Sequence, residues 1–136
     1  MHCALPLALA LLAVAVGCGK QTGVATPSKS LNYTLDISGD KKVQNPSEAV
    51  IREAVLALDT KKGGAFLVVE VTKLTYIQTS GDGRVGFELE YQESDIRHHF
   101  RAKRRFTADE IVKVLTSYTT GVDDWKKAAE WELLKW

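Results

Sequence analysis

The segment 97–105, RHHFRAKRR, concentrates side chains that could do chemistry. Its five Lys or Arg residues, two histidines and one phenylalanine are types that bind phosphate groups or nucleic acid. Taken from Ile96, however, the segment alternates between mostly apolar and mostly basic positions, which is typical of a β-strand with one buried face. Two interpretations therefore compete, a basic binding surface and the charged face of a sheet.

A preceding segment, 85–92, alternates in the same way and carries acidic side chains. If Ser94 and Asp95 form a two-residue hairpin turn, Glu93 pairs with Ile96. This register predicts the pairs Glu88–Arg101 and Glu90–His99 on one face, and Leu89–Phe100 and Tyr91–His98 on the other. The remaining cations, at the end of the strand, are Lys103, Arg104 and Arg105. We expect a charge-balanced sheet face and no nucleic-acid partner, with an anionic partner at the strand end as the alternative.

The overall charge agrees with this expectation. The chain has 18 Lys and Arg against 17 Asp and Glu, a formal net charge of +1, which gives no long-range attraction for polyanions. Its 45% hydrophobic and 26% charged residues are typical of globular proteins and exclude a wholly disordered chain. Two cysteines cannot form a disulfide scaffold.

Metal and catalytic patterns are weak. Adjacent strand residues point to opposite faces, so His98 and His99 cannot chelate one ion together. Glu88 and Glu90 share a face and could form a carboxylate pair, although alternating acids on a solvated sheet face are common. No GxSxG, HExxH or phosphate-binding loop is present in the sequence. We therefore expect no catalytic residues, no metal and no cofactor.

The elements that position these side chains predict an α+β fold, an antiparallel sheet of about five strands with helices packed on one face. The expected strands are 31–38, 65–71, 74–79, 85–92 and 96–103, with a turn at 80–83. One helix is expected after an N-cap at Asn45 with Pro46 as its first residue, and a second after a capping box at Thr107 and Glu110. The order is strand, helix, four strands, helix.

Three tryptophans, Trp125, Trp131 and Trp136, lie in the last twelve residues. One interpretation is that Trp125 and Trp131 fix the tail to the core, through a short helix from Asp124 that docks on the sheet. The other is partner contact, because tryptophan is common at interface hot spots. We take as candidate partner-binding residues Tyr76, Gln78, Glu88, Glu90, His99, Arg101, Trp125 and Trp136.

The N-terminus predicts export. Residues 4–17 are uncharged and apolar, but as a helix they rise only roughly 21 Å, less than the roughly 30 Å of a bilayer core. The following Ala15-Val16-Gly17-Cys18 resembles a bacterial lipobox, which implies lipidation of Cys18; ordinary cleavage with a free thiol is the alternative. We expect a signal peptide at 1–17, a lipidated flexible tether at 18–30 and one α+β domain at 31–136. The expected location is the bacterial cell envelope, on a membrane-anchored lipoprotein facing the periplasm or the exterior.

Segments between residues 43 and 134 carry a further resemblance. They include Asn45-Pro46 before a helix, the segments 76–78, 86–92 and 97–102, and Trp131-Glu132. Together they resemble a group of small bacterial proteins, some of which are regarded as immunity proteins of toxin systems. The resemblance implies a protein partner, and it supplies no active-site residue to carry over.

Two functions follow as hypotheses. The first is a membrane-tethered, non-enzymatic extracytoplasmic binding domain, with an immunity-like role as one form. The second is a small enzyme or ligand-binding lipoprotein that uses the polar sheet face around Tyr76, Gln78, Glu88, Glu90 and His99.

Overall fold

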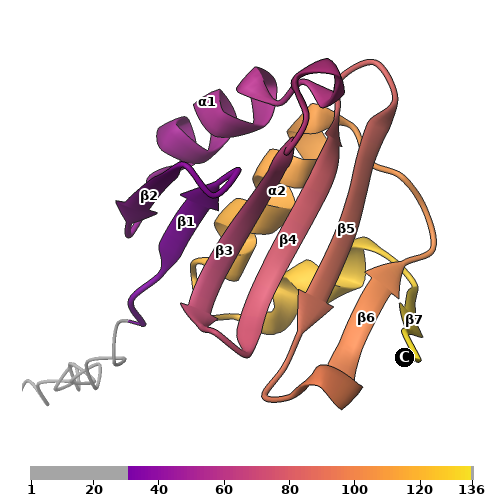
Figure 1. The fold of residues 1–136 in the computed structure, drawn as a ribbon. Coiled ribbons are helices and arrows are strands. Elements are labelled where there is room, and N and C mark those ends of the chain that lie inside the picture. The colour runs from indigo at the N-terminus through magenta and orange to yellow at the C-terminus, as the bar shows by residue number, and fades with distance from the viewer. Residues whose placement is uncertain (1–30, 136) are drawn as a thin grey trace, which may run out of the picture.

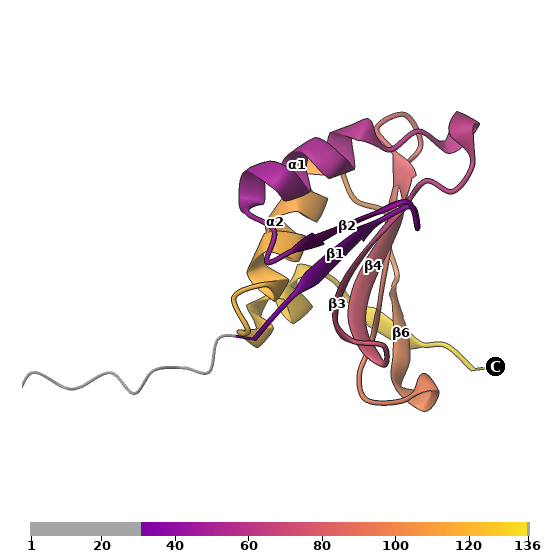
Figure 2. The same cartoon turned by 60° about the vertical axis from the view of Figure 1, so that its left-hand side comes forward.

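The structure is a computed structural model that describes residues 31–135. It is α+β, with two α-helices on one side of an antiparallel sheet (Figures 1 and 2). The strands are β1 (Thr34–Ile37), β2 (Lys41–Gln44), β3 (Phe66–Thr72), β4 (Thr75–Asp82), β5 (Gly86–Gln92), β6 (His99–Ala102) and β7 (Trp131–Leu133). The helices are α1 (Glu48–Ala57) and α2 (Ala108–Tyr118), with 3-10 helices η1 (Thr60–Lys62), η2 (Ile96–His98) and η3 (Asp123–Ala128).

The expected fold class is confirmed, but the expected strand number is too low. The described residues form a seven-stranded sheet in the order β2-β1-β3-β4-β5-β6-β7. The prediction missed β2, a short and mostly exposed strand that follows a tight turn in which Ser38 and Gly39 have φ of 54° and 80°. Two consecutive positive φ angles form the hairpin turn that matches strand twist. It also missed β7, whose three residues are too few to show an alternation.

The two α-helices begin at side-chain caps. The α1 cap is Ser47, whose hydroxyl accepts a hydrogen bond from the Val50 N–H, so the prediction of Asn45 as the cap is wrong by two residues. Asn45 has φ of 46° and its side-chain oxygen accepts from the Tyr33 N–H instead. The predicted capping box of α2, formed by Thr107 and Glu110, is confirmed.

The core lies between the helices and the inner face of the sheet. Leu35, Leu67, Ile77 and Leu89 come from four adjacent strands and are fully buried. The helices meet them with Ile51 and Val55 from α1 and Ile111 and Leu115 from α2. Each such side chain contributes about 1.5–3 kcal/mol when removed from water, so this layer dominates the stability of the fold.

The C-terminal tail is held by aromatic packing. Trp125 in η3 and Trp131 in β7 each contact the Tyr91 ring edge-to-face, with ring centroids 4.8 Å apart in both pairs. The two tryptophans also contact one another at 5.9 Å. The tail therefore adds the last strand to the sheet in addition to a short helix, where the sequence predicted only a helix.

The predicted register of β5 and β6 is wrong. The observed pairs are Glu90↔Arg101, Tyr91↔Phe100 and Gln92↔His99, a shift of two residues from the prediction. The connection is longer than a two-residue turn, because Ser94 has φ of 65° and η2 follows it. The η2 cap is Asp95, which accepts a hydrogen bond from the Arg97 N–H. A shift of two leaves His99, Phe100 and Arg101 on their expected faces, since the strand period is two. The predicted strand start at Ile96 is wrong, because Ile96–His98 form η2, and His98 lies next to Asp95 instead of opposite Tyr91.

Candidate functional site

Most of the predicted site residues lie on the face of the sheet that points away from the helices, as the strand register and the alternating burial show. This face is turned toward the viewer in Figure 1. We call it the open face. Its central part is formed by alternate residues of four strands: Phe66, Val68, Tyr76, Gln78, Ser80, Glu88, Glu90, Gln92, His99 and Arg101. Cross-strand register places Gln78, Glu90 and Arg101 in one row and Tyr76, Gln92 and His99 in the next.

Glu90 is the centre of the first row. Its Oε2 accepts hydrogen bonds from the Gln78 Nε2 at 2.8 Å and the His99 Nε2 at 3.0 Å. Its Oε1 accepts from the Arg101 Nε at 2.7 Å. Burial acts to raise the pKa of the Glu90 carboxyl, but the hydrogen bonds from Arg101, Gln78 and His99 outweigh it and hold the pKa below its usual range. The carboxylate is therefore ionised at neutral pH and fixed by three donors.

The second row orders the neighbouring side chains. The Tyr76 hydroxyl donates to the Gln92 Oε1 at 3.4 Å, and the Gln92 amide donates to the backbone oxygen of Leu74 at 3.3 Å. The His99 ring lies edge-on to the Tyr76 ring, with centroids 6.1 Å apart. His99 and Gln92 are buried although they lie on the open face, because these neighbours cover them.

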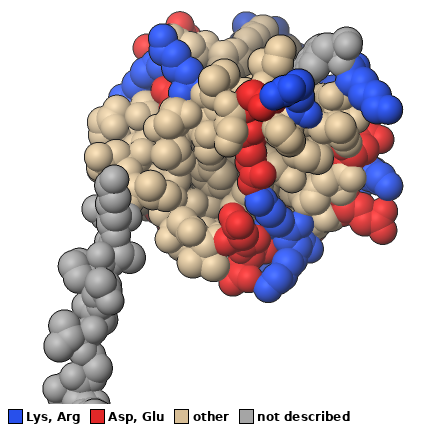
Figure 3. Space-filling model, turned by 90° about the horizontal axis from the view of Figure 1, so that it is seen from below, with Lys and Arg blue, Asp and Glu red and all other residues tan. Residues whose placement is uncertain are grey.

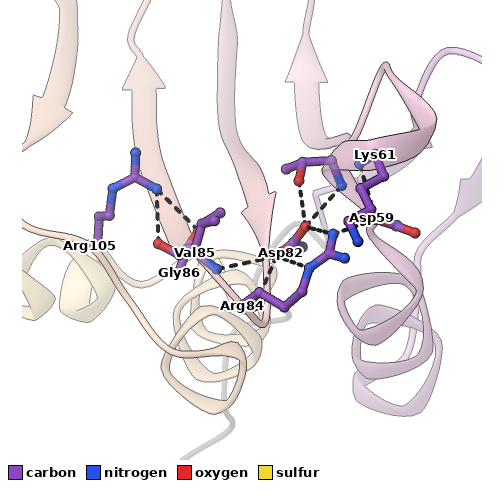
Figure 4. A network of polar contacts seen from close by, with 8 residues as sticks. Asp59, Lys61, Asp82, Arg84, Val85, Gly86 and Arg105 are labelled. Atoms are coloured by element: carbon purple, nitrogen blue, oxygen red, sulfur yellow. Dashed lines mark hydrogen bonds and ion pairs between the residues drawn. The ribbon is translucent and has the colours of Figure 1, made fainter.

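Glu88 is held by Arg105, one of the three cations at the end of the strand for which the sequence predicted no acidic partner. The Arg105 Nη2 donates to the Glu88 Oε1 at 2.6 Å. The Arg105 Nη1 donates to the backbone oxygens of Val85 and Gly86 (Figure 4). Glu88 keeps 43% of its side chain exposed, so it remains accessible to a partner.

A second polar network holds the β4–β5 turn next to η1 (Figure 4). The buried Asp82 carboxylate accepts from the Thr60 N–H and hydroxyl and from the Arg84 guanidinium, which also pairs with Asp59. The Arg84 guanidinium, followed by the Thr60 donors, holds the pKa of Asp82 well below its usual range. This network fixes the turn that joins two strands of the open face, and we assign it a structural role.

A hollow of about 340 Å³ lies on the open face between β3, β4 and β5. Phe66 and Val68 give it an apolar side, and Gln78, Ser80 and Glu88 give it hydrogen-bonding groups. The sequence prediction did not include Phe66, Val68 or Ser80. The pairing of β3 with β4, which sets Phe66 opposite Ser80 and Val68 opposite Gln78, is the signal that would have found them.

The structure brings six of the eight predicted partner-binding residues onto one surface. The remaining two are the tryptophans. Trp125 is 5% exposed and packs between Tyr91 and Tyr118, which agrees with the tail-fixing interpretation and leaves little of its ring for a partner. Trp136 and the predicted lipidation residue Cys18 lie outside the described residues.

The basic segment is balanced by carboxylates more completely than the sequence predicted. The strand-end pairs are Lys103–Glu130 at 3.5 Å, Arg104–Glu110 at 3.0 Å and Arg105–Glu88 at 2.6 Å. Arg101 pairs with Glu90 rather than with the predicted Glu88. Because every one of these cations has an acidic neighbour, the segment offers little uncompensated positive charge to a polyanion.

The protonation state of Glu90 limits the chemistry of this face. A general acid must hold a proton at working pH, and a carboxyl whose pKa is lowered does not. Its two oxygens are also engaged by three donors, which weakens it as a base. The arrangement is better suited to present fixed polar groups to a bound molecule than to transfer protons.

Within residues 31–135, no group of three or more His, Cys, Asp or Glu is placed to hold a metal ion. No helix in that range is long and apolar enough to cross a membrane. Comparison of the chain with protein-family models, with curated proteins and with solved structures gives no match.

Proposed function

We propose that the chain is a non-enzymatic binding domain of the bacterial cell envelope, attached to a membrane through Cys18, and that its open face binds a protein partner. The observation that carries the proposal is the Glu90 network. Three donors hold its carboxylate in place, so the polar groups around it are ordered before any partner arrives. Ordering side chains costs about 0.5–1.5 kcal/mol each on binding, and a preordered face avoids much of that cost.

The hollow beside this network indicates what the partner presents. Phe66 and Val68 suit an apolar stem, while the partly exposed Glu88 carboxylate and the Gln78 amide suit a donor at its end. A lysine, arginine or tyrosine side chain combines these two features. The partner therefore inserts one such side chain into the hollow and lies across the polar rows of the open face.

Immunity is the specific form of this function that the resemblance of residues 43–134 implies. An immunity protein works by covering its toxin, so the open face would be the surface that meets a secreted toxin. A small-molecule ligand is the second candidate, favoured by the volume of about 340 Å³ of the hollow, which is in the range of small-ligand sites.

Site-specific photo-crosslinking in the producing cell tests the proposal. A photoreactive residue replaces exposed Ser80, which lines the hollow, and in a control it replaces exposed Lys113 on α2. The proposal expects one adduct of fixed added protein mass from position 80 and none from position 113. A small-molecule site would give no protein adduct at position 80, and that result, or equal adducts from both positions, would contradict a protein partner on the open face.

A further inference from the structure

Segments far apart in the sequence meet at the end of the sheet where β1 begins. We call this end, formed by Leu31 and residues 72–75, 92–98 and 119–123, the entry end (Figure 1). The β3–β4 hairpin, the end of β5 and the loop from α2 to η3 all contribute residues to one hollow that Leu31 also lines. The connection to η2 joins them, because the Ser94 N–H donates to the Thr75 hydroxyl.

Exposed apolar side chains gather at the entry end. Leu31 lies beside Gly121 and hence close to Val122. Figure 3 looks onto this end and shows a broad uncharged area. An exposed apolar area of this kind is typical of a contact with a membrane or a protein. Among residues 31–135, seven large hydrophobic residues are exposed, and four of them, at 45% to 63%, belong to the entry end: Leu31, Leu74, Ile96 and Val122.

The charges of the described residues at the entry end balance. The exposed Lys73 adds one cation to those that form ion pairs there, so three cations stand against three carboxylates. With no net charge to attract a charged surface, contact at this end depends on the apolar side chains. The ion pairs are Arg97–Asp95, Lys126–Glu93 and Lys126–Asp123.

The chain that precedes Leu31 indicates what covers the entry end. Twelve residues, 19–30, separate Cys18 from Leu31. A chain of this length spans at most about 45 Å, whereas β4, which runs from the entry end to the opposite end, is about 25 Å long. A lipid anchor at Cys18 therefore keeps the entry end close to the bilayer. Tethering raises the effective concentration of the two surfaces, so a contact that is weak by itself is sufficient.

We propose that the entry end rests on the membrane surface, with its four exposed apolar side chains inserted at the boundary between lipid headgroups and acyl chains. This inference rests on the proposed anchor at Cys18. β3, β4 and β5 extend from the entry end to the opposite end of the molecule (Figure 1). The sheet then stands upright on the membrane, and its open face stays accessible to a protein partner.

The test uses the lipidated protein, purified from the producing cell and returned to phosphatidylcholine vesicles. Its intact mass shows whether the acyl chains are present. A fluorescent amino acid replaces Leu74, and lipids brominated on their acyl chains quench it if it enters the bilayer. In the matched control it replaces Leu56, a leucine 66% exposed beside the β4–β5 turn at the opposite end. Quenching at position 74 should be at least about threefold stronger than at position 56.

A pair of substitutions tests whether the apolar side chains make the contact. With the fluorescent amino acid at position 122, Leu74→Asp should lower the quenching at least about threefold, because a charge is costly to bury in the bilayer. Leu56→Asp makes the same chemical change at the opposite end and should leave the quenching unchanged. Both leucines are exposed, so the fold should persist. Adding an anionic lipid should not change the quenching, because the charges at the entry end balance.

Equal quenching at positions 74 and 56, or quenching that requires an anionic lipid or survives Leu74→Asp, would overturn the proposal. A blue-shifted emission at position 74 without quenching would assign this end to a second copy or another protein, which also overturns it. A protein purified without acyl chains would overturn the anchor at Cys18 and this inference with it. Because the open-face residues are unchanged in these variants, the crosslinking result at Ser80 is independent of all these outcomes.

Discussion

Replacement of Glu90 by Gln isolates the contribution of its negative charge at the centre of the open face. The substitution keeps the side-chain shape and one acceptor oxygen for Arg101, and it removes the charge that Gln78 and His99 also contact. Hydrogen bonds to charged groups contribute about 1.5–3 kcal/mol, about twice a neutral bond. Gln78 can turn its amide and His99 can change tautomer to restore neutral bonds. We therefore expect Glu90→Gln to lower the free energy of unfolding by about 1–3 kcal/mol.

Thermal and urea unfolding measure this loss. For a domain of this size, 1 kcal/mol changes Tm by about 4 °C, so the expected decrease is about 4–12 °C. The matched control is Glu88→Gln on the same strand and face, whose carboxylate is 43% exposed and paired with Arg105. An exposed pair contributes about 0–1 kcal/mol, so the control should lose no more than that.

The stability difference between wild type and Glu90→Gln should also depend on pH, in a direction that the lowered pKa of Glu90 determines. The pKa of Glu90 is lowered on folding, so its stabilisation is complete above the ordinary glutamate value of about 4.3 and is lost as pH falls through the lower folded value. The stability difference between wild type and Glu90→Gln should therefore shrink below about pH 4. A loss no larger than that of Glu88→Gln, or a difference independent of pH, would refute the assignment of Glu90 as the centre of the network.

Three further predictions concern the anchor and the β4–β5 turn. Cys18→Ala should abolish incorporation of labelled fatty acid, and equal labelling of wild type and variant would exclude a lipid anchor at this residue. Gly81→Ala should destabilise the fold by about 1–3 kcal/mol, since Gly81 has φ of 123° and an added Cβ would collide with the Gly86 oxygen. The control Gly83→Ala meets nothing within 4 Å and should have little effect on Tm, so equal losses would contradict the strain argument. Asp82→Asn should destabilise the protein at pH 7 and destabilise it less in acid. The folded-state pKa of Asp82 is lowered, so the stabilisation that its carboxylate provides decreases as the pH falls below the ordinary aspartate pKa of about 3.9. A loss of stability that grows in acid would contradict this assignment.

The fold class was predictable because hydrophobic alternation and helix caps are local signals. The capping box of Thr107 and Glu110 and the alternation of 85–92 needed no tertiary information. The missed strands β2 and β7 are held by neighbours rather than by their own pattern, as Trp131 is by Tyr91 and Trp125. Such tertiary stabilisation cannot be read from three or four residues.

The sequence was sufficient to predict which side chains share the open face, but not which of them form hydrogen bonds with one another. The alternation of side chains along a strand places Gln78, Glu90 and Arg101 on one side of the sheet, and a register error of two residues does not change that. The partners depend on the register, which depends on the positive φ of Ser94 and the turn of η2. Serine gives little indication of a positive φ in sequence, so the pairing of Glu90 with Arg101 required the structure.

The most direct test of the central claim is the affinity of the purified chain for the protein crosslinked from position 80. Ser80→Arg places a large charged side chain at the hollow without removing any member of the Glu90 network. If the open face binds the partner, this variant should lose at least about tenfold in affinity, while Lys113→Glu on the exposed surface of α2 should bind like wild type. Unchanged affinity in Ser80→Arg, with the loss appearing in Lys113→Glu, would place the partner on the helical side and contradict the account.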